Sequence, residues 1–404
     1  MVAGQHAGGP VRTHQSGWDS CIVVVAGTPW EGMRSSERAL AAQLASHQRV
    51  LWVDPPVSLA RPSRSRLSRA VSGPVLQSDG TVTVHPMTVP GVSRPVLREV
   101  AAAQSRRAVR TALNQLGATA TAVLVASTAD MLDCAPGALR VFYGTDDFVA
   151  GAGLMGLRTA AVQAAERRQL ATADLVLAVS PALCERWAAM GVTPALLPNG
   201  ADVEAMAAVD TVRPADDVNL PGPVAGFVGH ISGRLDLALL AAVADRGVSL
   251  LLVGPVPRSS RPAGLEALLA RPNVLATGVR PFTQLPAYYR HMDVGLTPYA
   301  DNAFNRASFP LKTLEYLAAG LPVVATDLPA NDYLAKGLVR VGADAASFAN
   351  QVVEALAGAH APAQVLERRR AAAEHSWGRR AEQVLELIGA AAPARYAATS
   401  GRRR

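Results

Sequence analysis

The hydrophobic positions of the chain form short runs of β-branched and aliphatic residues that alternate with amphipathic stretches. In the first half, residues 36–46 and 94–116 repeat their apolar positions with the period of a helix. Strands and helices that alternate at this spacing predict a parallel sheet with helices on its faces. The strands expected in this half are residues 21–27, 50–54, 81–85, 122–127, 141–144 and 175–180.

The same alternation begins again after a break. The boundary follows residues 196–202, and residues 210–223 are rich in Pro and Asp without a hydrophobic period, as in a linker. A chain of 404 residues also exceeds what one hydrophobic core usually supports. We therefore predict an α/β protein with two doubly wound Rossmann-like domains that face each other across a cleft. The second set of expected strands is residues 224–229, 250–254, 274–278, 294–298, 322–327 and 338–341.

The domain boundaries follow from these patterns. Residues 1–20 and the basic residues 391–404 lack a hydrophobic pattern and are expected to be disordered tails, and residues 55–74 to be a long mobile loop. The expected folded parts are an N-terminal domain over residues 21–205, a C-terminal domain over 206–365, and helices over 366–390 that pack back toward the N-terminal domain.

Composition excludes several classes of protein. The formal net charge is +7, but no zinc-finger, helix-turn-helix or RNA-binding signature accompanies it, so a nucleic-acid partner is not expected. Cys21, Cys134 and Cys184 lie far apart without metal-ligand spacing, which suits a reducing compartment. No apolar run is long enough to span a bilayer. We expect a cytoplasmic protein whose basic excess allows peripheral contact with an anionic membrane at its inner face.

One stretch near residue 310 has the features of an anion site. An expected strand ends near Pro298, a loop follows, and a helix begins at Pro310 and stops at Gly320. Free N–H groups at a helix start attract phosphate. Lys312 adds a charge in the first turn; it is one of two lysines, with Lys336, among 39 basic residues. Glu315 follows, placed to accept the hydroxyls of a ribose, so the stretch fits a nucleoside diphosphate.

This stretch resembles the donor-binding element of the retaining GT-B glycosyltransferases, the group 1 or family 4-like superfamily. The shared features are the helix that ends Ala-Ala-Gly-x-Pro-Val-Val, the Pro-Asn-Gly at 198–200 and the Phe-Val-Gly at 227–229. The Trp-Glu-Gly-Met-Arg at 30–34 resembles a loop of the bacterial subgroup that glycosylates cell-surface polymers, teichuronic-acid-type enzymes among them. The resemblance is strong from 224 to 330.

The resemblance implies a nucleotide-sugar donor bound by the C-terminal domain and an acceptor bound by the N-terminal domain. Lys312 and Arg234 would neutralise the departing diphosphate, and we expect neither a bound cofactor nor a metal ion. The implied donor-binding residues are Gly229, His230, Val279, Ser308, Leu311, Thr313 and Glu315. The acceptor-side candidates are Trp30, Arg34, Asp130, Asp146 and Asp147.

Some of these residues have simpler interpretations. Arg234 could pair with Asp236, and His230 could be an ordinary loop residue. Asp146 and Asp147 resemble a metal-binding Asp-x-Asp only superficially, and cleft lining or helix capping suits them better. The sequence also departs from the family pattern. Ala307 stands where a Glu usually contacts the donor sugar, and no His is evident after the strand at 122–127.

The predicted function is transfer of a sugar from a nucleoside-diphosphate sugar to a hydroxyl acceptor: a cell-surface polysaccharide, a glycolipid or a secondary metabolite. The resemblance implies retention of configuration. Two alternatives stay open. A catalytically silent nucleotide-sugar-binding protein would explain Ala307, whereas a sugar-nucleotide epimerase would need clustered carboxylates and His that are not evident.

Overall fold

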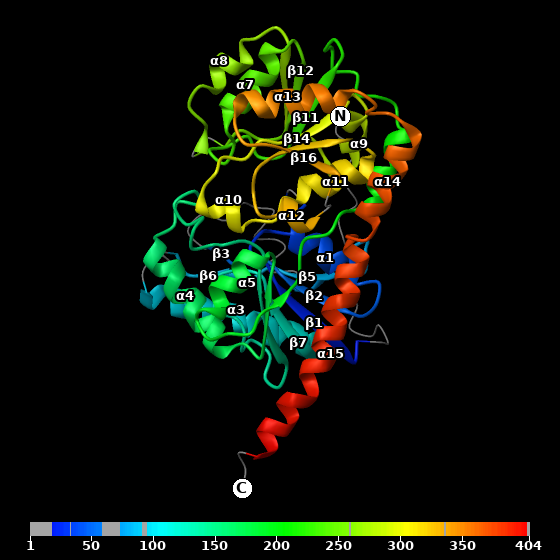
Figure 1. The fold of residues 1–404 in the computed structure, drawn as a ribbon. Coiled ribbons are helices and arrows are strands. Elements are labelled where there is room, and N and C mark those ends of the chain that lie inside the picture. Colours follow the sequence, from blue (N-terminus) through cyan, green and yellow to red (C-terminus); the bar gives the residue numbers. More distant parts are fainter. Residues whose placement is uncertain are drawn as a thin grey trace. The chain divides into compact units, whose positions relative to one another are not determined.

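The computed structural model describes residues 18–32, 34–58, 73–90, 95–257, 260–334 and 337–401 (Figure 1). Its residues group into two compact units. Unit 1 comprises Met1–Ala152, Leu157–Pro198 and Arg380–Arg404, and unit 2 comprises Gly153–Gly156 and Asn199–Arg379. Each unit is built on its own parallel sheet, which confirms the predicted fold class.

The sheet of unit 1 has eight strands in the order β10-β9-β8-β7-β1-β2-β5-β4 among the described residues. All its pairings are parallel except β4 with β5. The order reverses beside β1, since β2 lies on one side of it and β7 on the other. The strands are β1 (Ser20–Val25), β2 (Val50–Val53), β4 (Val75–Leu76), β5 (Val82–Val84), β7 (Thr119–Val125), β8 (Leu139–Gly144), β9 (Leu175–Ala178) and β10 (Ala195–Leu196), with β3 (Val57–Ser58) and β6 (Met87–Thr88) as a separate pair.

The central strands of unit 1 are buried along most of their length, because helices cover both faces of a parallel sheet. Ile22, Val123 and Leu124 are completely buried. Side chains at the strand ends start two of the helices: Ser35 caps α1 and Ser180 caps α5. The helices are α1 (Ser36–Leu44), α3 (Pro95–Leu116), α4 (Thr159–Thr172) and α5 (Pro181–Ala188).

The sheet of unit 2 has six parallel strands in the order β13-β12-β11-β14-β15-β16 in the described part of the chain. The order reverses beside β11, which lies between β12 and β14. The strands are β11 (Val224–Val228), β12 (Ser249–Val253), β13 (Val274–Gly278), β14 (Val294–Thr297), β15 (Val323–Thr326) and β16 (Val339–Gly342).

Most helices of unit 2 are short. Helices α7 and α13 pack together on one face of the sheet, where Leu240, Val243 and Phe348 contribute to one hydrophobic core. The helices are α6 (Val203–Ala207), η1 (Ala208–Asp210), α7 (Leu237–Asp245), α8 (Leu265–Leu269), η3 (Phe282–Gln284), α9 (Leu285–Tyr289), α10 (Ala303–Ala307), α11 (Leu311–Ala319), α12 (Asn331–Leu334), α13 (Ala345–Leu356) and α14 (Pro362–Ala373). Helix α15 (Trp377–Gly401) runs from unit 2 into unit 1.

Helix α11 lies close to β14 because that strand has a glycine where the two elements meet. A Cβ on Gly295 would lie 2.3 Å from the ring of Tyr316, so no larger residue fits without displacing the helix. The helix ends where the sequence predicts. Gly320 adopts φ 87°, a left-handed conformation that favours glycine at a helix C-terminus.

The chain ends and the presumed linker differ from the sequence-based expectations. Trp18 is buried, so the disordered tail expected over residues 1–20 does not extend that far, and residues 1–17 lie outside the described part. The disordered tail expected from residue 391 is instead helix up to Gly401, because this segment is rich in alanine, the strongest helix former. Most of the loop expected over 55–74 is outside the described residues.

The segment 210–223 is attached to unit 2 rather than free. The carboxylate of Asp217 accepts a hydrogen bond from Tyr288 Oη at 2.9 Å and forms an ion pair with Arg280. The ring of His291 contacts the carbonyl of Ala215 at 2.9 Å. The Pro and Asp content of segment 210–223 prevents regular structure, as expected of a linker. Side-chain contacts that the sequence pattern does not show nevertheless hold the segment in place.

Candidate functional site

The candidate site of unit 2 lies where its strand order reverses. In open parallel sheets, the loops after two strands on either side of such a reversal diverge and leave a crevice at the carboxyl ends. Here these strands are β11 and β14, which pair at Gly226 and Gly295. The loop after β11 carries His230 and Arg234, and the segment after β14 leads through α10 to Lys312 and Glu315 on α11.

Arg234 is held at this edge by stacking and by one side-chain hydrogen bond. Its guanidinium lies 4.6 Å from the ring centre of Phe304 and 5.2 Å from that of Tyr299. Its Nε donates to Asn305 Oδ1 at 3.0 Å. The pairing with Asp236 that the sequence allowed is not formed, since Asp236 instead caps α7 by accepting from Ala238 N. Arg234 is therefore a positioned cation without a carboxylate partner among the described residues.

Asn305 is the buried residue that joins the two loops. Besides accepting from Arg234, its amide donates to the carbonyls of Arg234 at 3.0 Å and Ala300 at 2.8 Å. Asn305 lies within α10 and is only 2% exposed. Sequence reasoning missed this residue. An Asn in a short polar stretch gives little signal, because its partners are mainly backbone groups that only the fold identifies.

Lys312 and Glu315 form an ion pair in the first turns of α11. The Nζ of Lys312 lies 2.6 Å from Oε2 of Glu315, and the same oxygen accepts from Tyr289 Oη at 2.7 Å. Glu315 is only 5% exposed. Its other oxygen, Oε1, has no hydrogen-bond partner among the described residues. Oε2 of the carboxylate is thus fixed by two contacts, while Oε1 can still accept a hydrogen bond from a hydroxyl.

Two tyrosines hold this helix start against the sheet. Tyr316 Oη accepts from the N–H of Val228, the last residue of β11, at 2.9 Å. Tyr289 packs edge to face against Tyr316, with ring centres 5.6 Å apart. Burial raises the pKa of Tyr289 well above its usual value, and the negative charge of Glu315 adds to this, so Tyr289 stays a neutral donor to Glu315.

The opposite end of α11 is neutralised by arginines of α14. Arg368, which is 4% exposed, donates to the carbonyls of Gly320 and Ala359. Arg369 donates to the carbonyl of Ala319 at 3.2 Å. Cations at a helix C-terminus oppose the negative end of its dipole. The contacts fix the axis of the helix that carries Lys312 and Glu315.

His230 lies beside the two cations. Desolvation lowers its pKa from the usual 6.5, and the positive charges of Arg234 and Lys312 lower it further. The structure therefore brings Arg234, Lys312 and His230 within electrostatic reach of one another. A region that disfavours an additional positive charge in this way is suited to receive an anion.

The other predicted donor-side residues have different surroundings. Gly229 has φ 156°. A Cβ on Gly254 would lie 2.0 Å from the carbonyl oxygen of Gly229, so the two backbones approach closely. Val279 is 55% exposed after β13. Ser308 donates to the carbonyl of Phe304 at 2.9 Å, which ties its hydroxyl to α10. Leu311 is half-buried at the start of α11.

Thr313 differs from these, because its hydroxyl is buried and unpaired. The residue is fully buried, and its Oγ1 has no hydrogen-bond partner among the described residues. A buried hydroxyl without a partner is unfavourable by about 1–3 kcal/mol. Thr313 lies one residue after Lys312 on α11, at the same helix start.

Unit 1 has its own strand-order reversal, between β1 and β7. The loop after β1 there is fixed at Trp30, which is 5% exposed. Its N–H donates to Asp54 Oδ1 at 2.7 Å, its carbonyl accepts from Arg38 at 2.6 Å, and its ring packs against Trp52. The side chain of Trp30 therefore packs inside unit 1, and its acceptor-side role stays a prediction.

Asp54 organises this region and was missed by sequence reasoning. It follows β2 and accepts from Trp30 N, from Trp52 Nε1 at 2.8 Å, and shares a 2.7 Å contact with His85 Nδ1. Both Asp54 and His85 stand directly after strands, and that position was the only signal in the sequence. The contacts fix the loop after β1 from the neighbouring strands.

Glu37 is a second residue of unit 1 that the sequence analysis missed. It lies in the first turn of α1, is 6% exposed, and accepts from Thr28 Oγ1 at 2.8 Å. A Cβ on Gly27 would lie 3.9 Å from its Oε1 and 3.5 Å from Ser127, so these residues meet at the reversal. Among the described residues no cation pairs with Glu37. Burial raises its pKa, and the charge of Asp146 raises it slightly further.

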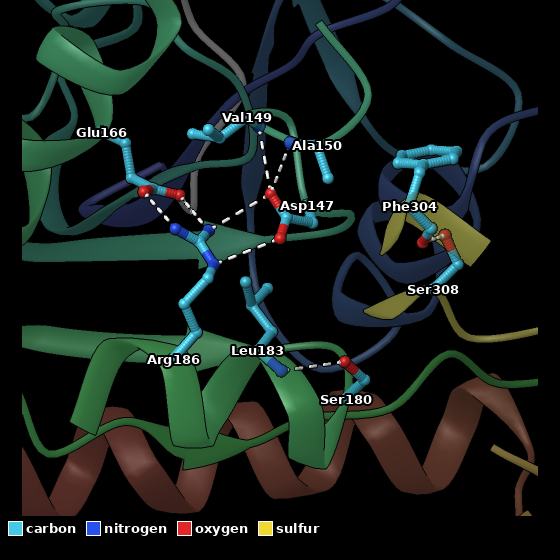
Figure 2. A network of polar contacts seen from close by, with 9 residues as sticks. All are labelled: Asp147, Val149, Ala150, Glu166, Ser180, Leu183, Arg186, Phe304 and Ser308. Atoms are coloured by element: carbon cyan, nitrogen blue, oxygen red, sulfur yellow. Dashed lines mark hydrogen bonds and ion pairs between the residues drawn. The ribbon is translucent and has the colours of Figure 1, made fainter. Parts of the chain in front are cut away.

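Two predicted acceptor-side aspartates form ion pairs. Asp130 pairs with Arg106 at 3.3 Å. Asp147 accepts from the N–H groups of Val149 and Ala150 and pairs with Arg186, whose guanidinium also binds Glu166 (Figure 2). Asp147 is 5% exposed and serves as a cap and an ion-pair partner, and its acceptor-side role stays a prediction. Arg34 and Asp146 are half-buried at the edge of unit 1.

The described residues contain no group of three or more His, Cys, Asp or Glu side chains placed to hold a metal ion. In that part of the chain, no helix combines the length and the apolar character needed to cross a membrane.

Two units, each with helices packed on its own doubly wound parallel sheet, are the architecture of the GT-B fold. Solved structures share this fold over nearly the whole chain. Sucrose-phosphate synthase from Thermosynechococcus elongatus has a TM-score of 0.72 at 19% identity, covering 93% of this chain and 100% of that one. Anabaena Alr3699/HepE in complex with UDP and glucose has a TM-score of 0.65 at 14% identity, covering 91% and 99%. At these identities the likeness establishes the fold.

A family match lies in unit 2. Residues 222–358 match the model of the family described as Glycosyl transferases group 1. The protein named "Putative teichuronic acid biosynthesis glycosyltransferase TuaH" of Bacillus subtilis (strain 168) is 38% identical over 120 residues, 29% of this chain. The match spans 30% of that relative. The resemblance expected from the sequence is thereby confirmed.

Proposed function

We propose that the protein transfers a sugar from a nucleoside-diphosphate sugar to a hydroxyl acceptor. The observation that carries this proposal is the arrangement at the strand-order reversal of unit 2. Arg234 and Lys312 supply two cations, and Glu315 supplies a buried carboxylate three residues after Lys312. A diphosphate joined to a ribose has the matching charges, with anionic oxygens for the cations and hydroxyls for Glu315.

In this proposal the cations act on the leaving group. As the bond between the sugar and the diphosphate breaks, negative charge develops on the phosphate oxygens, and fixed positive charges lower the energy of that state. Arg234 is held by Phe304, Tyr299 and Asn305, so it needs no reorganisation during the reaction. We propose that this charge stabilisation replaces a divalent metal.

The carboxylate at this edge suits binding rather than covalent catalysis. Glu315 Oε2 is already engaged by Lys312 and Tyr289, which lowers its capacity as a nucleophile. We therefore propose retention of configuration by front-face attack of the acceptor, assisted by the leaving phosphate, as the family resemblance implies.

Ala307 supports one alternative. It lies in α10, is 7% exposed, and stands where the family pattern usually has a sugar-binding Glu. A protein that binds nucleotide-sugars without turning them over would tolerate this change. In an active enzyme, Ala307 would instead change which sugar is accepted.

The test begins with a thermal-shift panel of UDP, GDP, dTDP and their sugars on the full chain. Stabilisation by one base supports the donor site, and none with any nucleotide would overturn it. The preferred nucleotide-sugar is then incubated with the protein in excess chelator. Release of the nucleoside diphosphate supports the metal-independent enzyme, whereas binding without release over long incubation, with or without magnesium, supports the silent binding protein.

A further inference from the structure

Glu37 is a buried carboxyl of unit 1 that the proposed donor chemistry of unit 2 does not use. It lies in the first turn of α1, is 6% exposed, and has as hydrogen-bond partners the hydroxyls of Thr28 and Ser35 and its own N–H. None of these partners is a cation. Arg38, the next residue, instead donates to the carbonyl of Trp30 and lies 4.5 Å from the centre of the Trp30 ring.

A carboxyl at this position is unfavourable for folding. Burial raises the pKa of Glu37, which means that the surroundings disfavour its charged form. Gln has nearly the same shape and could keep the contacts with the hydroxyls, and burying an amide costs less than burying a charge without a partner. The contacts within the fold therefore do not account for a carboxyl at position 37. A carboxylate accepts hydrogen bonds more strongly than an amide does, and its two oxygens can accept about four, so it can still bind a donor from a ligand.

This carboxyl borders an open position at the strand-order reversal of unit 1. Gly27 follows β1, is exposed, and does not have the left-handed backbone that would require glycine. A Cβ on Gly27 would lie 3.9 Å from Glu37 Oε1, 3.5 Å from the Cβ of Ser127, and 3.4 Å from the carbonyl oxygen of Ala126. Ala126 and Ser127 follow β7, the neighbour of β1 in the sheet (Figure 1). Open parallel sheets bind ligands at the carboxyl ends of such strands, and glycine leaves room there between Glu37 and Ser127.

The polar groups around this position match a ligand that carries hydroxyls and no negative charge. Glu37 accepts hydrogen bonds, whereas the hydroxyls of Thr28 and Ser127 can both donate and accept. Ser127 is 8% exposed, and its Oγ accepts from the N–H of Ala129 at 3.3 Å, which leaves its proton to donate. The charge of Asp146, after β8, raises the pKa of Glu37 further, so a second negative charge lies within electrostatic reach. A phosphate or a carboxylate placed here would be repelled by both carboxyls.

We propose that Glu37 binds a hydroxyl of an uncharged sugar at the position beside Gly27, with Thr28 and Ser127 adjacent, and that this sugar is the acceptor of the transfer. The inference rests on the function proposed above and names the class of acceptor, a neutral sugar rather than a sugar phosphate or a uronic acid. Glu37 acts by binding alone and forms no covalent bond with the acceptor. Its loss should therefore affect the acceptor and leave the donor site of unit 2 unchanged.

The test measures transfer from the nucleotide-sugar that thermal shift identifies to a panel of p-nitrophenyl glycosides. The neutral arm contains the glucoside, the galactoside, the mannoside and the N-acetylglucosaminide, and the anionic arm contains the glucuronide and the galacturonide. Mass spectrometry measures the glycosylated products, and release of the nucleoside diphosphate without any glycoside measures cleavage of the donor by water. The full-length wild type is expected to glycosylate a neutral glycoside about tenfold faster, or more, than either uronide, because like charges disfavour the uronides.

Two variants test the residues that form this position. Gly27→Ala fills the space beside Glu37 with contacts of ordinary length, so the melting temperature should stay unchanged while transfer falls about tenfold or more. Gly389→Ala, on α15 where a Cβ would meet nothing within 4 Å, is its matched control and should transfer like the wild type.

Glu37→Gln should raise KM for the neutral glycoside about tenfold, because a charge-assisted hydrogen bond becomes a neutral one. It should also reduce the preference for neutral over anionic glycosides by about as much, because one of the two repelling charges is removed. Glu185→Gln, at an exposed position of α5, is the matched control and should change neither value. Cleavage of the donor by water should match the wild type in all four variants.

Faster transfer to a uronide than to every neutral glycoside would overturn the proposal, and so would an unchanged KM in Glu37→Gln. Equal loss of transfer and of donor cleavage by water in Glu37→Gln would show a structural role instead. If the wild type cleaves the donor but glycosylates no neutral glycoside, the acceptor assignment is wrong while the donor chemistry of the proposed function stands. If the protein neither binds nor cleaves any nucleotide-sugar, the proposed function is wrong, and this inference fails with it.

Discussion

The two units share a topology, yet their strand-order reversals carry opposite chemistry. In unit 2 the reversal beside β11 brings together Arg234, Lys312 and His230 with one carboxylate, Glu315. In unit 1 the reversal beside β1 has the uncompensated carboxyl of Glu37, with the charge of Asp146 in electrostatic reach. The same fold element therefore gathers positive charge in unit 2 and a buried carboxyl in unit 1.

The difference also extends to how each loop is held. In unit 2, Asn305 fixes the loop after β11 through backbone carbonyls and leaves the charged end of Arg234 without a carboxylate partner. In unit 1, Asp54 and Arg38 fix the loop after β1 through the backbone and ring of Trp30. The loop after β11 thus holds the cation of Arg234 in place, whereas the loop after β1 keeps the side chain of Trp30 buried. The following variants test this contrast.

The largest expected effect is that of Arg234→Ala. If Arg234 faces the leaving diphosphate as proposed, removing this fixed cation should lower turnover about a hundredfold or more, roughly 2.7 kcal/mol of transition-state stabilisation. Arg246→Ala is the control, since Arg246 caps α7 and bonds to Asn350 on the surface. Steady-state kinetics on the donor identified by thermal shift measures both. Comparable losses in the two variants would contradict a specific role for Arg234.

Glu315→Gln should weaken binding of the nucleoside diphosphate by about 1–3 kcal/mol, because a charge-assisted hydrogen bond to a hydroxyl becomes a neutral one. Isothermal calorimetry measures the affinity. Glu354→Gln serves as the control, because Glu354 pairs with Arg340 on the surface. Unchanged affinity in Glu315→Gln would mean that the ribose does not bind there.

Lys312→Arg should reduce turnover about tenfold, or ~1.4 kcal/mol, although it keeps the charge. The ammonium reaches Glu315 Oε2 at 2.6 Å from a position that is 20% exposed, and a longer planar guanidinium cannot occupy the same place. Arg340→Lys, at an exposed position, is the control and should change nothing measurable. If Lys312→Arg turns over as fast as the wild type, the charge alone matters at this position.

Glu37→Gln should stabilise the protein at neutral and alkaline pH. Because burial raises the pKa of Glu37, the folded state holds its proton above pH 4.5, and stability falls as pH rises through the folded pKa. Gln removes this ionisation, so thermal unfolding at pH 8 should shift upward by about 2–4 °C, a stabilisation on the order of 1 kcal/mol. The gain should vanish near pH 4.5. A lower melting temperature at pH 8 would show that the carboxylate is stabilising.

The smallest effect concerns His230. Its lowered pKa means that the unfolded chain takes up a proton first, so this residue reduces stability as pH falls below 6.5. A bound diphosphate should raise the pKa of His230, and nucleotide affinity should therefore improve as pH falls through the raised value. Imidazole resonances titrated with and without UDP measure this, with His291 as a reference signal. A pKa of His230 that does not move on UDP binding would place the diphosphate elsewhere.

Much of the architecture was predictable from local pattern. Continuous apolar runs such as 224–229 and 294–298 become buried parallel strands, because helices on both faces require apolar residues at every position. Gly320 ends α11 because only glycine adopts its left-handed backbone without strain. The short strands β3, β4, β6 and β10 were not predicted, since two residues carry no measurable period.

The candidate site was only partly predictable. Lys312 and Glu315 were identified because they lie on one helix start, where spacing in the sequence gives spacing in space. Asn305, Tyr289 and Asp54 were missed because their partners are distant in the sequence: Tyr289 and Glu315 are 26 positions apart, and Asp54 and His85 are 31. Trp30 and Asp147 were assigned to the acceptor from their position after strands, which does not show the direction of a side chain.

The sequence by itself therefore determined the class of fold, the position of the helix start that carries Lys312, and the surplus of positive charge. These features depend on local periodicity and composition, which are properties of short segments of the sequence. Only the tertiary structure decided that Arg234 is free of Asp236, that Glu37 is buried with no cation partner among the described residues, and that Leu154, Met155 and Leu157 are each exposed. Burial and pairing depend on which distant segments meet, and no single segment contains that information.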